Sequence, residues 1–159
     1  MTTKTFFPTL VRSEPVGDVD LATRLEHVCW VLAEDDSAGN AWCEEQGYGG
    51  YTSYASLDDL PERFPEFAEL KALLDPMADA FAQELDWDME GLSLELDAIW
   101  VNILEPGFGH SNHIHPGSVI SGTSNRQSAT PSCGKAGCAM KGPPIWARNR
   151  GSRSASITP

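Results

Sequence analysis

The sequence predicts an α+β fold for residues 1–123, followed by a segment, 124–159, outside that fold. Two observations predict the first part: apolar residues recur at helical spacing in two stretches, and a third stretch alternates apolar and polar residues as a half-buried strand does. A third observation predicts the boundary, because neither kind of periodicity continues beyond residue 123. The expected arrangement is a set of N-terminal helices packed on the first strands of a sheet.

The first helix is predicted to begin after Asp18 or Asp20, either of which is a suitable N-cap. It is expected to end near Ala33, and residues 34–50 are then expected to form a loop because they are polar and contain several glycines. Its apolar stripe consists of Leu21, Leu25, Val28, Cys29 and Leu32.

The second helix is predicted to begin near Pro65, since proline is favoured in a first turn. Its stripe continues to Leu85, and Pro76 inside it predicts a kink or two abutting helices. The larger aromatic residues of this region are expected in the core: Trp30, Phe67, Phe81, Trp87 and Trp100.

Four stretches are predicted as strands. Residues 5–12 form an edge strand, because Pro8 cannot donate to a ladder, and residues 51–54 form a short one. The strict alternation of residues 92–97 leads into the apolar run 98–104, which is expected to enter the core. Residues 118–123 resemble the start of a further strand.

Charge is unevenly distributed along the chain. All 23 acidic residues lie between Glu14 and Glu105, and the formal net charge of the chain is −12. An acidic body argues against a nucleic-acid partner, because phosphate contacts need clustered Lys and Arg. No run approaches the roughly 20 apolar residues of a membrane span, and residues 1–11 lack the features of a secretory signal. The expected location is the cytoplasm, where the four cysteines stay reduced.

Residues 124–159 differ from the rest in composition. They are rich in Ser, Ala, Gly, Pro and Arg, and their large aliphatic or aromatic residues are Ile145, Trp146 and Ile157. Such a segment buries too little apolar surface to offset its ordering entropy. We expect a disordered tail, either genuine or produced by an out-of-frame continuation.

Three of the four histidines, His110, His113 and His115, fall within six residues. In an extended segment residues i and i+2 point to the same side, so His113 and His115 can present two imidazoles to one metal ion. Neutral imidazole suits Fe(II), Zn or Cu. His110 is expected to be accessory or structural. The competing interpretation is that the pair lies on a loop and only hydrogen-bonds to water.

The sequence around this pair resembles the 2-oxoglutarate/Fe(II)-dependent oxygenases of bacterial and phage origin. The specific part of the resemblance consists of residues 100–103, 109–110, 113–116 and 118–123. Residues 6–11, 49–54 and 85–88 support it. The resemblance therefore covers about residues 5–123 and none of the segment that follows.

This resemblance implies a double-stranded β-helix, or jelly roll, of which residues 1–123 would form an incomplete domain. It implies Fe(II) and 2-oxoglutarate, with His113 and His115 as two iron ligands, in a dioxygenase that hydroxylates its substrate. The family's distal histidine and basic 2-oxoglutarate anchor come several strands later. Here no histidine follows His115, and the pattern is lost after Thr123. We therefore expect a chain that is C-terminally truncated or frameshifted relative to the family and inactive by itself, with no catalytic residue assigned.

Two alternatives remain open at this point. His113 and His115 could join Cys133 and Cys138 in a structural zinc site with two nitrogen and two sulfur ligands. The chain could instead be a non-enzymatic remnant or an interaction module. The prime substrate and the oligomeric state do not follow from the sequence.

Overall fold

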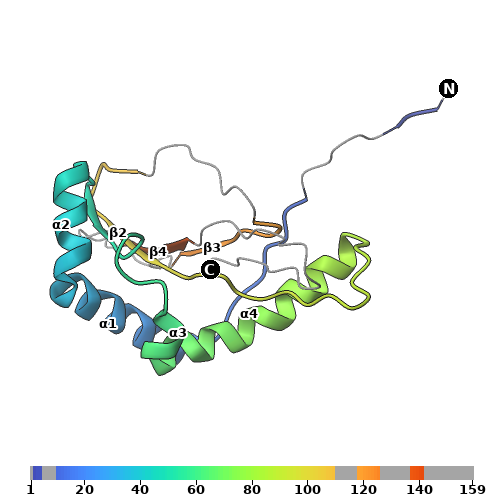
Figure 1. Ribbon diagram of the computed structural model, residues 1–159, viewed down its shortest axis with the longest axis horizontal. Coiled ribbons are helices and arrows are strands. Elements are labelled where there is room, and N and C mark those ends of the chain that lie inside the picture. Colours follow the sequence, from blue (N-terminus) through green and yellow to red (C-terminus); the bar gives the residue numbers. More distant parts are fainter. Residues whose placement is uncertain (1, 5–9, 110–117, 126–136, 142–159) are drawn as a thin grey trace.

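The computed structural model describes residues 2–4, 10–109, 118–125 and 137–141, of which 124–125 and 137–141 are described as backbone only. The fold is α+β, as predicted. Helices pack on one face of an antiparallel sheet whose strand order is β1-β2-β4-β3 (Figure 1). In chain order the elements are α1 (Val19–Asp35), α2 (Ser37–Gln46), β1 (Gly50–Thr52), α3 (Leu60–Arg63), α4 (Pro65–Glu84), β2 (Val101–Leu104), β3 (Thr123–Asn125) and β4 (Gly137–Lys141).

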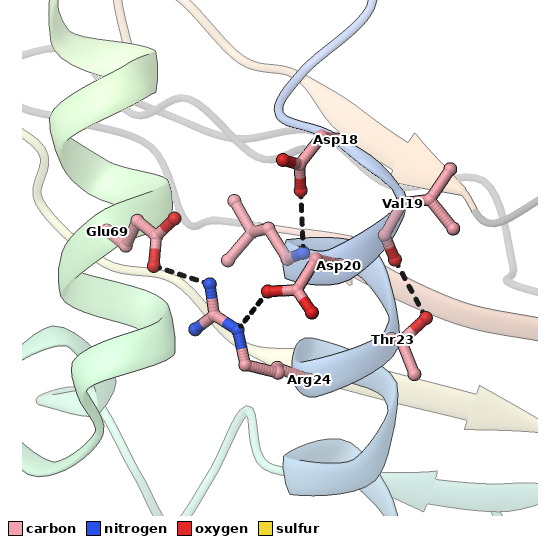
Figure 2. A network of polar contacts seen from close by, with 7 residues as sticks. Asp18, Val19, Asp20, Thr23, Arg24 and Glu69 are labelled. Carbon is pink, nitrogen blue, oxygen red and sulfur yellow. Dashed lines mark hydrogen bonds and ion pairs between the residues drawn. The ribbon is translucent and has the colours of Figure 1, made fainter.

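Helix α1 begins as the sequence predicts. The side chain of Asp18 accepts a hydrogen bond from the Leu21 N–H at 2.9 Å, which caps the first turn. One turn further on, Arg24 donates to Asp20 at 2.9 Å and to Glu69 of α4 at 2.7 Å (Figure 2). These ion pairs are exposed and add little to stability. They join the exposed sides of two helices whose association comes from the apolar stripe beneath them.

Residues 34–50 are not the loop that the sequence was expected to form, because α2 occupies most of this range. The Asp36 side chain caps its start by accepting from the Gly39 N–H at 2.9 Å. Gly47 ends it in the left-handed region with φ 62°. The helix is hard to recognise in the sequence because its buried face consists only of Gly39 and Cys43, one turn apart.

Helix α4 is a single helix that passes through Pro76, where two abutting helices were one of the expectations. A proline inside a helix removes the hydrogen bond to the carbonyl four residues earlier. That carbonyl belongs to Ala72, and both Ala72 and Pro76 are exposed. Water can therefore bond the carbonyl, which lowers the cost of the missing N–H.

Residues 92–97 keep the predicted alternation but do not form a strand. Leu94 and Leu96 are half-buried and pack against the two apolar clusters, whereas Ser93, Glu95 and Asp97 are exposed. The alternation therefore reports burial on one side of an extended chain, not strand pairing. The ladder begins later, at Val101, where β2 pairs with β1 and with β4.

The sheet has two different faces where β1 meets β2. Tyr51, Val101 and Ile103 point into the main core, against the apolar stripes of α1 and α4. Side chains alternate along a strand, so Thr52 and its register partner Asn102 point to the opposite face. Any site that these two strands carry away from the helical core lies on this second face.

Other expectations have mixed outcomes. Trp30, expected in the core, is 41% exposed because it lies on the solvent side of α1. Residues 5–9 of the expected first strand lie outside the described residues, and residues 10–12 belong to no strand. Within the expected tail, the structure describes Gly137–Lys141 as a strand that pairs with β2 and β3. The disorder of residues 124–159 as a whole stays a prediction.

Candidate functional site

The predicted metal ligands, His113 and His115, lie in residues 110–117, outside the part of the chain that the structure describes. Their geometry, and that of His110, stays a prediction. The structure does show where this segment leaves and rejoins the fold. It leaves after β2 at Gly109, and the chain beyond it brings Ile120 into a small apolar cluster with Ala78 of α4.

The exit from β2 is a tight turn over residues 105–108. Pro106 and Gly107 occupy its central positions, Gly107 has φ 91°, and the Phe108 N–H donates to the Glu105 carbonyl at 3.1 Å. This is the arrangement of a type II turn, in which glycine supplies the positive φ. The turn is also held to β1, because the Glu105 N–H donates to the Gly49 carbonyl at 3.1 Å.

Asn102 is the polar residue of β2 on the second face of the sheet, and it is 2% exposed. Its Oδ1 accepts a hydrogen bond from the Tyr48 hydroxyl at 3.1 Å. Its Nδ2 is buried and has no hydrogen-bond partner among the described residues. A buried donor without a partner costs about 1–3 kcal/mol of stability. The Asn102 Nδ2 group therefore either destabilises the fold or is placed to donate to an acceptor atom of a bound molecule.

Aromatic side chains adjoin this amide. Trp42 lies 6.4 Å from Tyr48 and 6.0 Å from Tyr54, centroid to centroid. Tyr54 in turn lies 5.0 Å from Trp100, edge to face. Trp100 is buried and Tyr54 is 54% exposed, so the row leads from the interior to the surface. Tyr48 connects this row to the amide through its hydrogen bond to Asn102.

Cys43 covers the free edge of β1. The Thr52 N–H donates to Cys43 Sγ at 3.2 Å, and the thiol donates to the Thr52 carbonyl at 3.8 Å. The thiol thus takes the place of a neighbouring strand. Burial raises the pKa of the Cys43 thiol, against a smaller opposite effect of its backbone contact. It is therefore protonated at neutral pH and a poor nucleophile. Cys29 is buried in the core as predicted, and neither Cys29 nor Cys43 forms a disulfide within the described residues.

Asp36 joins α1, α2 and the segment after β1. Besides capping α2, its carboxylate accepts from the Tyr51 hydroxyl at 2.9 Å and from the Ser56 hydroxyl at 2.5 Å. Its own N–H ends α1 by donating to the Leu32 carbonyl at 2.9 Å. Burial, followed by the bond to Asp36, raises the pKa of Tyr51. A tyrosine that stays protonated and hydrogen-bonded in this way is structural.

Neither Asn102 nor Asp36 was assigned a functional role from the sequence. Asn102 lies within the run that carries the family resemblance, but only its burial and unpaired Nδ2 distinguish it from an ordinary strand residue. The capping role of Asp36 could have been predicted from the sequence, because aspartate is a favoured N-cap residue and its side chain accepts from the N–H three residues later, here that of Gly39.

No protein-family model and no curated protein matches the chain. Within the described ranges there is no group of three or more His, Cys, Asp or Glu side chains that could hold a metal ion. Within the same ranges, no helix has the length and apolar character needed to cross a membrane.

Proposed function

We propose that the chain is related to the 2-oxoglutarate/Fe(II)-dependent oxygenases, that β1 and β2 belong to a jelly-roll sheet, and that His113 and His115 bind Fe(II). The observation that supports this beyond the sequence resemblance is Asn102. Its buried Nδ2, without a partner in the described part of the chain, lies on the strand that leads into the histidine segment. A binding site for 2-oxoglutarate needs N–H donors of this kind for the carboxylate and carbonyl oxygens of the acid.

The donor set of the chain fits this metal in part. Neutral imidazoles bind Fe(II) well, but the family's site needs a third protein ligand, and no histidine follows His115 in these residues. When bound, Fe(II) with 2-oxoglutarate supplies oxidative decarboxylation coupled to hydroxylation of a substrate. We propose that the 159 residues bind the metal weakly and release no succinate, because they supply two imidazole ligands and not the third ligand.

The other residues have binding and positioning roles in this proposal. The Tyr48 hydroxyl donates to Asn102 Oδ1 and so directs Nδ2 away from itself. The free N–H groups then donate to a carboxylate or carbonyl oxygen of the bound acid. Asn102 is itself only 2% exposed, and a buried environment strengthens a hydrogen bond to a charged oxygen.

The test is calorimetric titration of 2-oxoglutarate into the chain with Mn(II), which does not support turnover. Asn102→Leu keeps the size and removes the donor, so binding should fall at least tenfold, the equivalent of one charge-assisted hydrogen bond of about 1.5–3 kcal/mol. The matched control is Thr52→Val on the same face, because the Thr52 hydroxyl already has a partner, the Tyr54 N–H, at 3.2 Å. Equal losses in both variants, or no binding by the parent chain, would contradict the proposal.

A further inference from the structure

The helical body of the protein carries a large excess of carboxylates over cations. All 23 acidic side chains lie in a region that contains three basic ones, Arg24, Arg63 and Lys71. Each of the three already contacts a carboxylate, as Arg24 does with Asp20 and Glu69 (Figure 2). The remaining carboxylates produce a negative potential, which attracts positively charged partners and repels acidic ones.

Trp42 and Tyr54 form the exposed end of the aromatic row that begins at Trp100. Their ring centroids lie 6.0 Å apart in an edge-to-face arrangement. Tyr54 is 54% exposed and Trp42 is half-buried, so solvent reaches this end of the row. The faces of Trp and Tyr rings attract cations, because the π-electrons give each face a partial negative charge.

Carboxylates of α2 adjoin the aromatic pair. Glu45 follows Trp42 by three residues, so the two side chains lie on the same side of the helix. Glu44 and Glu45 are exposed, and neither belongs to an ion pair among the described residues. An approaching cation therefore meets both an aromatic surface and a carboxylate that is not already paired.

We propose that Trp42, Tyr54 and Glu45 form a docking surface for an arginine side chain of a partner polypeptide. A guanidinium group is planar, stacks on aromatic faces and can pair with a carboxylate through two parallel N–H groups. It is also less strongly hydrated than the ammonium group of lysine. The charge of the body selects a cationic partner, and the aromatic pair selects the guanidinium among cations. Neither a metal ion nor 2-oxoglutarate takes part in this contact.

Fluorescence anisotropy of a labelled tetra-arginine peptide, titrated with the metal-free chain, measures this contact. The parent chain should bind this peptide more tightly than tetra-lysine, which has the same charge. It should not bind tetra-citrulline, whose side chains are planar but neutral. Tyr54→Leu and Trp42→Leu should each weaken tetra-arginine binding about two- to fivefold, the effect of one exposed contact between a cation and an aromatic ring. Tyr54→Phe keeps the ring and should bind as the parent does.

Two matched controls separate the docking surface from general attraction between charges. Trp30→Leu removes another exposed tryptophan, 41% exposed on α1 and outside the row, and should leave the affinity unchanged. Glu45→Gln should weaken binding more than Glu90→Gln does. Both remove one exposed carboxylate, but Glu90 belongs to the segment that follows α4, on the opposite side of the molecule from α2 (Figure 1).

Circular dichroism establishes which variants are folded, and Tyr54→Leu decides the outcome if Trp42→Leu does not fold. Equal tetra-arginine affinity in the parent and in Tyr54→Leu would overturn the proposal, because charge alone would then account for binding. Equal affinity of the parent for tetra-arginine and tetra-lysine, or no binding of tetra-arginine, would overturn it as well. Since the titrations contain no metal, none of these outcomes bears on the proposed Fe(II) ligands.

Discussion

Replacing Asp36 by alanine should be among the most destabilising single changes outside the apolar core. The carboxylate accepts from the Gly39 N–H, the Tyr51 hydroxyl and the Ser56 hydroxyl. Loss of the N-cap costs about 1 kcal/mol. Tyr51 is 5% exposed, so leaving its hydroxyl without an acceptor adds about 1–3 kcal/mol. The expected loss in the free energy of unfolding is therefore about 2–4 kcal/mol.

Urea denaturation followed by circular dichroism measures this change. Asp35→Ala is the matched control, because Asp35 is the exposed neighbour at the end of α1. It removes the same charge and should change stability by less than about 0.5 kcal/mol. Asp36→Asn retains an acceptor oxygen and should fall between the two.

A second variant separates the contribution of the buried Tyr51 hydroxyl from that of the α2 N-cap. In a Tyr51→Phe background, Asp36→Ala should cost only about 1 kcal/mol, because the cap is then the main loss. If Asp36→Ala destabilises the chain no more than Asp35→Ala does, Asp36 is not the junction of α1, α2 and the segment after β1.

Two further predictions concern the edge and centre of the sheet. Burial raises the pKa of the Cys43 thiol, so above its ordinary value of 9.0 the unfolded chain releases this proton first and stability falls as pH rises. The free energy of unfolding should fall by up to about 1.4 kcal/mol per pH unit. Urea titrations at pH 8.5 and 10 measure this slope, and Cys43→Ala should flatten it. Equal slopes in the parent and in Cys43→Ala would contradict the burial of the thiol. Ser53→Ala should cost about 1–3 kcal/mol in the same assay, because the buried Ser53 hydroxyl accepts from the Val101 N–H at 3.0 Å. A loss below 0.5 kcal/mol would show that another group takes over this N–H.

Much of the α+β fold could be predicted because its helices follow local rules. The start of α1 was readable from Asp18 and an apolar stripe, and α4 from Pro65 and a longer stripe. Helix α2 was missed because its buried face is so small that it leaves no periodic signal. The stretch 92–97 does show a periodic signal, but that signal was assigned to the wrong structure. Burial on one side gives the same alternation of apolar and polar residues in a paired strand and in an unpaired extended chain.

The candidate site was predictable only in its chemistry. Two imidazoles at i and i+2 identify a possible metal pair, but their spacing does not determine what lies opposite them. The surroundings of Asn102 depend on contacts between β1 and β2, which are about 50 residues apart in the sequence. No local pattern predicts such contacts, because they are set by how the strands come together.

Binding of Co(II) to the parent chain and its histidine variants tests the central claim most directly. Visible absorption reports the number of ligands and also whether a thiolate is among them. We predict weak binding without a thiolate band, lost in His113→Ala and in His115→Ala and little changed in His110→Ala. A thiolate band, with binding lost in Cys133→Ser or Cys138→Ser, would establish the zinc-type site instead. Binding that survives His113→Ala and His115→Ala would contradict the assignment of these two residues as metal ligands.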